Sequence, residues 1–180
     1  MSAFFDTLDS VYLPRKGTLL QLTYRLNDTA IGADANYQHL HFQYLGAHTW
    51  GDHTIVAGTR FSSTLAGTSP LYDTFSLGGF MNLSAYQHNE LNGQHLAFSQ
   101  LVYLKRLSSS RRFGSLPIYI GTSVEAGQTW DRGEKVRYAD LIYSGSLMGV
   151  VTTPFGAIYI GISRSNEGRS GAYLAIGRPF

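Results

Sequence analysis

Apolar and polar residues alternate along most of this chain. In residues 17–26, Leu20, Leu22 and Leu26 fall on one face of an extended segment, and Gln21 and Thr23 fall on the other. A period of two residues is typical of a β-strand whose two faces meet different surroundings. The pattern recurs near residues 39–44, 54–61, 95–105, 116–130, 139–151, 157–163 and 171–180, with no segment of helical period. The chain is therefore predicted to be all-β, with eight antiparallel strands.

One segment could be mistaken for a membrane-spanning helix. Residues 141–163 contain no charged side chain and are long enough to cross a bilayer as a helix. The segment is rich in glycine and β-branched residues, and Pro154 and Gly156 near its middle would break a helix. Two strands joined by a tight turn are predicted instead.

The connections between the predicted strands alternate in length. They are short at residues 51–52, 108–114 and 152–154, and longer at 27–35, 64–93, 131–138 and 164–170. Short turns at one end and long loops at the other are typical of barrels in bacterial outer membranes. The chain is divided into an N-terminal lead-in, residues 1–16, and a barrel domain, residues 17–180, whose longest loop spans 64–93.

Composition narrows the function classes. Only 14% of the 180 residues are charged, the net charge is +2, and there is no cysteine. A nucleic-acid partner is not expected, because such proteins carry a concentrated positive charge. Disulfides and thiolate metal sites are excluded. The first 16 residues lack the basic and apolar regions of a secretory signal, so a mature form or a fragment is expected.

The distribution of charge favours an antiparallel transmembrane β-barrel over a soluble one. The polar strand faces carry mostly Ser, Thr, Gly, His and Gln, which suits a lumen, and the aliphatic faces suit lipid. In residues 95–105 the lipid-facing set is predicted to be Leu96, Phe98, Val102 and Leu104. Open sheet edges are not tolerated in lipid, so the sheet must close, either alone as eight strands or with a second copy as half of a sixteen-stranded barrel. A soluble, lipocalin-like barrel with an apolar ligand is the alternative, and an outer-membrane esterase or lipid-modifying barrel is a third hypothesis.

Charged residues within the predicted strands are few. Glu125, Arg25, Arg60 and Lys105 are expected to face the lumen together. Because an unpaired buried carboxylate is costly, one of these cations is predicted to pair with Glu125.

Other candidate residues have simpler explanations than catalysis. His39 and His41 share a strand face near His48 and His53, but no acidic ligand has suitable spacing, so no metal site and no cofactor are expected. No catalytic triad can be assembled, so the protein is not expected to be an enzyme. Arg164 and Arg169 are candidates for contact with lipopolysaccharide phosphates. Girdle positions at the membrane boundary are expected for Tyr24, Tyr44, Trp130 and Tyr143.

Four motifs, in order along the chain, resemble the barrel of the outer-membrane assembly and two-partner-secretion superfamily, the group that contains BamA and the TpsB transporters. Residues 75–79, FSLGG, resemble its F-x-x-G-G loop entry, and residues 123–130, SVEAGQTW, resemble its hydrophobic-D-A-G-x-x-W wall segment. Residues 153–156, TPFG, match the turn before its penultimate strand. Residues 176–180, IGRPF, are similar to its terminal strand with a final aromatic.

The resemblance covers nearly the whole chain and implies that it is the C-terminal half of a sixteen-stranded barrel. The family's long loop folds into the lumen, which implies a lumen-loop motif of Phe75, Gly78, Gly79, Leu83, Ser84 and Tyr86. The family's loop carries V/I-R-G-F/Y, whose Arg meets the acidic wall residue, but this chain reads Leu83-Ser84-Ala85-Tyr86 there and has no Arg. The terminal strand implies an assembly signal in Tyr173, Ile176, Gly177 and Phe180.

The resemblance also implies a function. It implies an outer-membrane anchor or translocator in a Gram-negative bacterium, acting in protein secretion or outer-membrane assembly. The implied partners are outer-membrane lipid and lipopolysaccharide, the barrel assembly machinery, and an attached or partner polypeptide. The altered loop and low-charge ending also resemble the patatin-like autotransporters, in which a lipase domain precedes such a barrel.

Overall fold

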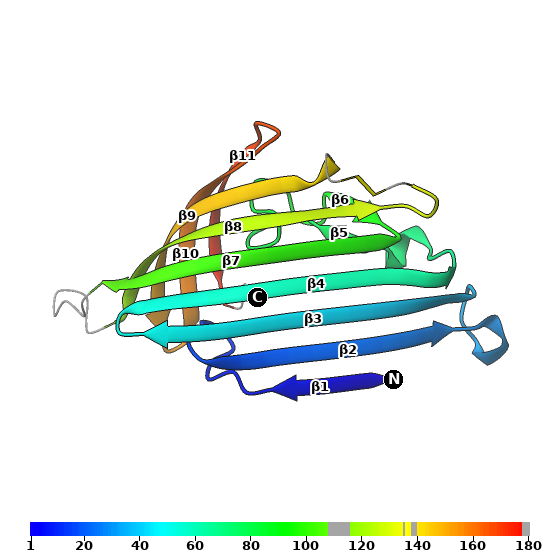
Figure 1. Ribbon diagram of the computed structural model, residues 1–180, viewed down its shortest axis with the longest axis horizontal. Coiled ribbons are helices and arrows are strands. Elements are labelled where there is room, and N and C mark those ends of the chain that lie inside the picture. The colour runs from blue at the N-terminus through cyan, green and yellow to red at the C-terminus, as the bar shows by residue number, and fades with distance from the viewer. Residues whose placement is uncertain (108–115, 135, 138–139, 178–180) are drawn as a thin grey trace.

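The computed structural model describes residues 1–107, 116–134, 136–137 and 140–177, and its main feature is one large antiparallel sheet (Figure 1). Nine strands form this sheet in the order β1-β2-β3-β4-β7-β8-β9-β10-β11. Their bounds are β1 Ser2–Asp6, β2 Gly17–Asn27, β3 Tyr37–Trp50, β4 His53–Gly67, β7 His95–Leu107, β8 Ile118–Trp130, β9 Ile142–Thr153, β10 Gly156–Ser165 and β11 Ser170–Ile176. The all-β, antiparallel prediction is confirmed.

The strand count and the closure differ from the prediction. The described residues contain eleven strands rather than eight, because β1 adds to the large sheet and two short strands, β5 (Phe75–Leu77) and β6 (Leu91–Gly93), pair with each other. Two short 3₁₀ helices are also present, η1 (Thr29–Ile31) and η2 (Leu71–Asp73). Within the described residues the large sheet is open, with β1 and β11 as its edges, so the predicted closed barrel is not observed.

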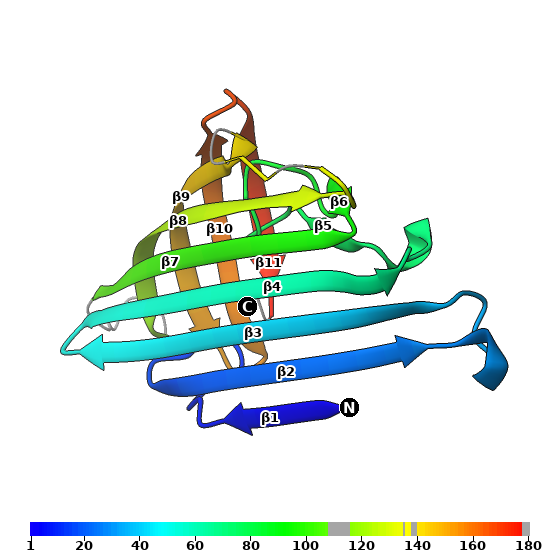
Figure 2. The ribbon, with the colours of Figure 1, turned by 45° about the vertical axis from the view of Figure 1, so that its right-hand side comes forward.

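The sheet curls around a concave side. In Figures 1 and 2, β9, β10 and β11 turn behind the plane of β2, β3 and β4 and run steeply across them. We call the concave side the inner face and the convex side the outer face. Among the described residues, no helix is long and apolar enough to cross a membrane.

Large apolar side chains cover the outer face. Leu22 is 44% exposed, Ile120 54% and Ile160 64%, whereas Glu125 on the inner face is fully buried. A soluble lipocalin-like carrier needs the opposite arrangement, with these aliphatic side chains gathered in the centre. The predicted division into an apolar outer face and an inner face that carries the small polar residues is therefore seen on seven of the eight predicted strands.

The exception is β7, where the predicted orientation is wrong. Leu96, Val102 and Leu104 are buried on the inner face, and Leu101 and Lys105 are on the outer face. The inner face is not uniformly polar, because a cluster of buried apolar residues fills it near the short turns. This cluster contains Leu13, Leu19, Leu45, Val56, Met81, Val102, Leu104, Tyr119, Met148, Val150, Ala157 and Tyr159. Apolar alternation alone cannot tell which face of a strand points toward such a cluster.

The segment before β2 contributes to this inner cluster. Residues 7–16 connect β1 to β2 and cross the inner side at the short-turn end of the sheet, where Leu13 is 4% exposed. Thr49 on β3 donates a hydrogen bond to the Arg15 carbonyl (2.8 Å), and Tyr159 on β10 donates one to the Tyr12 carbonyl (2.7 Å). Strands far apart in the sheet are thus linked through this segment.

Candidate functional site: a loop docked on the inner face

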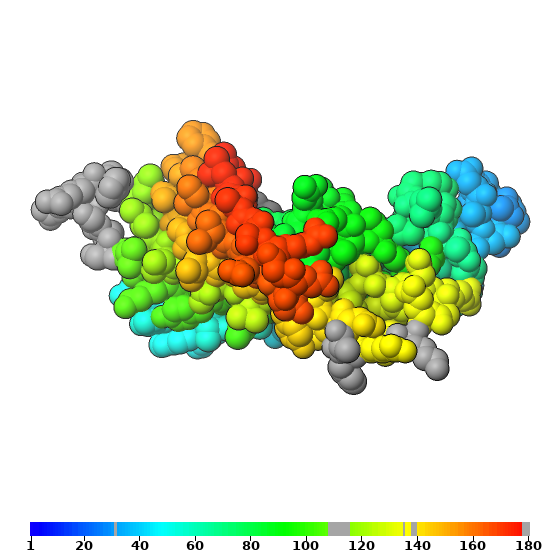
Figure 3. Space-filling view, turned by 90° about the horizontal axis from the view of Figure 1, so that it is seen from above, coloured from blue at the N-terminus to red at the C-terminus, as the bar shows by residue number. Residues whose placement is uncertain are grey.

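The connection between β4 and β7, residues 68–94, folds back against the inner face of the sheet, and we call it the inner loop. It carries η2, β5 and β6 and lies behind β7 and β8 in Figure 1. Seen from above in Figure 3, its green atoms lie beside the red and orange atoms of the last strands. Leu77 and Leu83 are fully buried in a second apolar cluster with Leu96 and Phe98 of β7.

Glycine is required where the inner loop turns sharply. Gly78 has a φ of 119°, and a Cβ atom there would lie 2.1 Å from the carbonyl oxygen of Gln87. Gly79 has a φ of 107°. L-residues with side chains rarely adopt such angles, so this pair sets the path of the loop. Met81 and Leu83 also have positive φ, and both are buried, so packing holds this strained stretch in place.

The tip of the inner loop is fastened to the sheet by Ser84 and Glu125. The backbone N–H of Ser84 donates to Glu125 Oε2 (2.6 Å), and the Ser84 hydroxyl donates to Oε1 (2.7 Å). Ser123, two residues before Glu125 on β8, donates a third hydrogen bond to Oε1 (2.6 Å). A buried carboxylate that accepts several short hydrogen bonds is stabilised without a cation.

Serines from three neighbouring strands extend this contact. Ser123 on β8, Ser146 on β9 and Ser163 on β10 are register partners, so their side chains form one row across the inner face. The Ser163 hydroxyl donates to the Ser84 carbonyl (2.7 Å), and Ala85 N–H donates to Ser144 Oγ (3.2 Å). Because serine alternates with apolar residues in these strands, the serine side chains lie together on the inner face and hydrogen-bond the backbone of the inner loop.

The predicted ion pair with Glu125 is wrong. Arg25 instead pairs with Asp73 of η2 (3.0 Å), and Arg60 donates to the Asn82 side-chain oxygen (2.5 Å). Lys105 lies on the outer face, because β7 has the opposite orientation to the one predicted. Among the described residues, no Lys or Arg lies within 4 Å of Glu125. The sequence signal that was missed is Ser84 itself, which can donate two hydrogen bonds from one residue.

The base of the inner loop is attached to β2 and β3. Asp73 accepts hydrogen bonds from Arg25 and from the Tyr37 hydroxyl (2.5 Å). Phe75 of β5 packs against the His39 ring, with the ring centroids 4.6 Å apart. The predicted motif residue Phe75 therefore contacts the wall of the sheet.

Polar contacts of Tyr86 and Glu90 join the inner loop to the β10–β11 turn, and we call these contacts the latch. The turn spans four residues, 166–169, and is shorter than the predicted connection at 164–170. The Tyr86 hydroxyl donates to Glu167 (2.5 Å), and the Arg169 guanidinium lies over the Tyr86 ring, 4.6 Å from its centroid. Arg169 also forms an ion pair with Glu90 of the loop. Burial and the bond to Glu167 raise the pKa of Tyr86. Arg169, a predicted lipopolysaccharide contact, thus has a carboxylate partner within the chain.

The family-level comparison agrees with this architecture. The model of the Omp85 superfamily domain matches residues 1–141, which include β1–β8 and the whole inner loop. The chain belongs to the Omp85 superfamily. No curated protein matches it in the comparison with such proteins.

Membership of the Omp85 superfamily gives the general character of the chain. It supports an outer-membrane barrel protein of the assembly and secretion type, with Gram-negative outer membrane as the suggested location. Omp85 proteins in general interact with the outer membrane and with partner polypeptides, and they are in general not enzymes.

The predicted girdle residues all lie on the outer face of this Omp85 domain. Tyr24, Trp130 and Tyr143 are near the long-loop end of their strands, and Tyr44 is in the middle of β3. Trp130 stacks on His95, with ring centroids 5.5 Å apart. Trp130 therefore has an aromatic neighbour in this half of the outer face.

A second aromatic group lies at the short-turn end of the outer face. Trp50 stacks between His48 and His53, and His53 hydrogen-bonds the Tyr103 hydroxyl (2.6 Å). On β7, His95 and Tyr103 are eight residues apart, which is roughly 26 Å along the strand and about 20 Å of height at a barrel tilt of about 40°, somewhat less than the apolar membrane band of about 25 Å. Cross-strand pairing, not spacing in sequence, brings these residues together.

The predicted assembly signal is only partly within the described residues. Tyr173 points to the inner face and packs on Phe80 of the inner loop, with centroids 4.1 Å apart, whereas Ile176 is 72% exposed on the outer face. Gly177 has a φ of 107°, and Phe180 lies outside the described residues. The whole of the predicted short turn at 108–114 also lies outside them. The signal stays a prediction.

The histidines considered as metal ligands are on opposite faces. His39 and His41 face inward, and His48 and His53 face outward. In the part of the chain that the structure describes, no three His, Asp or Glu side chains come together as a metal site would need.

Proposed function

We propose that this chain anchors an attached or partner polypeptide in the outer membrane and takes part in its translocation or assembly, with the inner loop as the element that occupies the lumen. The observation that carries the proposal is the docking of Ser84 on the buried Glu125 carboxylate. A loop fixed this way across a lumen controls what can pass. The match to the Omp85 superfamily supports the secretion or assembly role.

Closure of the sheet is part of the proposal. The outer face is apolar, and the exposed edges of β1 and β11 would leave backbone groups unpaired in lipid. We propose that a second copy of the chain supplies the missing pairing. Native mass measurement of the protein extracted in detergent tests this directly: a species of twice the chain mass is expected, and a folded monomer with fully protected edge amides contradicts it.

The proposed cargo is an attached domain of the kind found in patatin-like autotransporters. The support is the Arg-free loop segment Leu83-Ser84-Ala85-Tyr86, which departs from the pattern of BamA and the TpsB transporters. An antibody against residues 64–93 should detect, in the bacterium, a polypeptide much larger than this chain. Detection of a band no larger than the chain would contradict an attached cargo.

Translocation is tested in bacterial cells from which the gene for this chain has been deleted. Because an attached cargo disappears with the gene, cells complemented with the wild-type gene are the reference, and the cargo exposed on their surface or released into the medium is measured by quantitative mass spectrometry. The Glu125→Ala variant should reach the outer membrane but restore the cargo poorly, because the loop tip is released. Glu134→Gln, a change in an exposed loop, is the matched control. Equal amounts of exposed cargo with Glu125→Ala and with wild type would contradict the proposal.

A further inference from the structure

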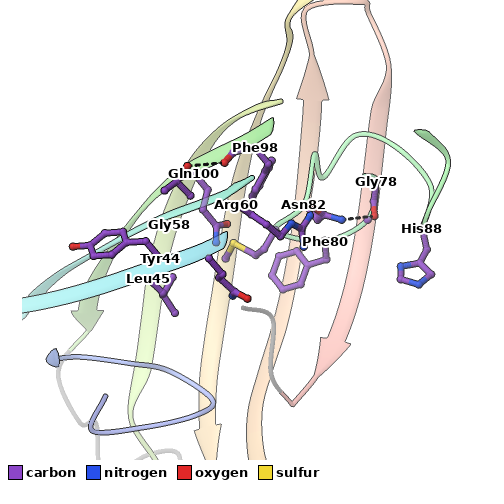
Figure 4. Close-up of a pocket in the computed structure, with 14 residues that line it drawn as sticks. Tyr44, Leu45, Gly58, Arg60, Gly78, Phe80, Asn82, His88, Phe98 and Gln100 are labelled. Carbon is purple, nitrogen blue, oxygen red and sulfur yellow. Dashed lines mark hydrogen bonds between the residues drawn. The ribbon is translucent and has the colours of Figure 1, made fainter. Parts of the chain in front are cut away.

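A small cavity lies between the inner face and the turn of the inner loop. Its volume is about 240 Å³, and its walls come from β3, β4 and β7 on one side and from residues 78–82 of the loop on the other (Figure 4). Gly58 on β4 keeps the wall open, because a Cβ atom there would lie 3.1 Å from the Gln100 side chain. The cavity is separate from the contact between Ser84 and Glu125.

Arg60 supplies the charge of this cavity. Its guanidinium lies over the Phe98 ring, 5.5 Å from the centroid, and one nitrogen donates to the Asn82 side-chain oxygen. That bond uses one of five N–H donors, and the buried Nε has no hydrogen-bond partner. Among the described residues, no Asp or Glu lies within 4 Å of this guanidinium. A partly buried cation of this kind is left without a counter-ion.

The other polar groups around Arg60 are neutral amides. Gln43 lies beside it on β3, Asn82 comes from the loop, and Gln100 lines the cavity from β7 with its side-chain oxygen buried and unpaired. His88 of the loop also lines the cavity, and no carboxylate does. The nearby wall carboxylate, Glu125, faces Ser84 and Ser123. A single guanidinium surrounded by neutral polar groups matches an oxyanion in charge and geometry.

We propose that this cavity is a binding site for a small oxyanion, a carboxylate or phosphate group, held by Arg60 at the junction between the sheet and the inner loop. The volume of the cavity admits a group of a few heavy atoms rather than a whole lipid or folded domain. Occupation would bridge Arg60 to the loop turn, so the ligand would also hold the loop in place. The proposal does not depend on translocation.

Isothermal titration calorimetry on the detergent-extracted protein tests the site. Three probes are used at matched ionic strength: N-acetylglycine for a peptide-type carboxylate, inorganic phosphate, and neutral acetamide. Saturable binding of one of the two anions is expected, with none of acetamide. The anion that binds identifies the source, whereas absence of binding by both anions overturns the proposal.

Two variants assign the binding to this cavity. Arg60→Gln should weaken it at least tenfold, and Gly58→Leu, which fills the cavity and keeps the charge, should do the same. Lys105→Gln is the control for the loss of a strand cation, because Lys105 lies on the outer face, away from the inner loop; binding should stay within twofold. Equal binding by Gly58→Leu and wild type overturns the proposal, even if Arg60→Gln does not fold.

Discussion

The backbone N–H and the hydroxyl of Ser84 both donate to the buried carboxylate of Glu125, at 2.6 and 2.7 Å. This relationship replaces the ion pair that the Omp85 resemblance implies at the same point of the lumen loop. A neutral residue can hold a carboxylate here because Ser123 adds a third donor and the serine row of β8–β10 binds the loop backbone. Glu125 on the sheet therefore keeps the acidic group that the resemblance implies, whereas its partner on the loop is a neutral serine and not an arginine.

Replacing Glu125 with Gln should release the loop tip. The amide puts an NH₂ group where one carboxylate oxygen accepted, so at least one of the three hydrogen bonds is lost and a donor faces a donor. We expect a loss of about 1–3 kcal/mol in the stability of the docked loop. Protease cleavage within residues 80–90 should become faster, with Glu134→Gln as the unaffected control. Unchanged cleavage in Glu125→Gln would show that Ser84 docking is dispensable.

Replacing Gly78 with Ala should disrupt the loop turn more than the same change at Gly133. Both glycines have positive φ, but a Cβ atom at position 78 meets the Gln87 carbonyl oxygen at 2.1 Å, whereas at position 133 nothing lies within 4 Å. Backbone strain alone costs about 1 kcal/mol, and the clash adds to it only at Gly78. The two variants are compared by thermal unfolding in detergent. Equal melting temperatures would mean that the turn at Gly78 relaxes freely.

The latch between the inner loop and the β10–β11 turn should weaken in acid. The backbone N–H of Gln87 and the ion pair with Arg169 lower the pKa of Glu90 below its ordinary value. Because the folded-state pKa is the lower one, the stabilisation is present above the ordinary glutamate pKa and is lost as the pH falls through the folded value. Glu90→Gln should therefore be more open to protease than wild type at pH 7, and the difference should shrink as the pH falls below the ordinary glutamate pKa and through the lower folded-state value. A constant difference across this range would exclude Glu90 as its source.

The two tryptophans should mark the two boundaries of the membrane. The chain has only Trp50 and Trp130, on the outer face near opposite ends of the strands, so Trp50→Phe and Trp130→Phe each leave one reporter. In vesicles with lipids brominated at different acyl depths, both should be quenched most by shallow bromines, because aromatic girdles lie at the headgroup boundary. Strongest quenching from the bilayer centre for either reporter would contradict the girdle assignment.

Much of the fold could be predicted because strand alternation is local information. The two-residue period predicts the eight strands and, for seven of them, which side chains lie on the outer face and which on the inner face. The orientation of β7 could not be predicted, because both of its faces carry large apolar residues, such as Leu101 outside and Val102 inside. Which of them points inward depends on the packing of Leu13 and Met81, which come from other parts of the chain.

The candidate site was predicted in position but not in chemistry. The loop motif around Gly78 and Ser84 and the wall residue Glu125 were identified, since the resemblance places them opposite each other. The partner of Glu125 was not, because a buried carboxylate ordinarily implies a cation. The row of Ser123, Ser146 and Ser163 forms only when three strands are in register. The strand β1 was missed because five exposed residues carry no burial pattern of their own.

The bond from Tyr159 to the Tyr12 carbonyl fixes the curved sheet at its short-turn end. Near the short turns, residues 7–16 tie β10 to the strands at the opposite margin, so the separation there is fixed. At the long-loop end the same margins are connected through the inner loop, which is held to β2 by the pair of Asp73 with Arg25 and to the β10–β11 turn by Tyr86 and Glu90. Widening of the curved sheet beside the long loops therefore requires these inner-loop contacts to break, whereas the separation at the short-turn end is set by residues 7–16.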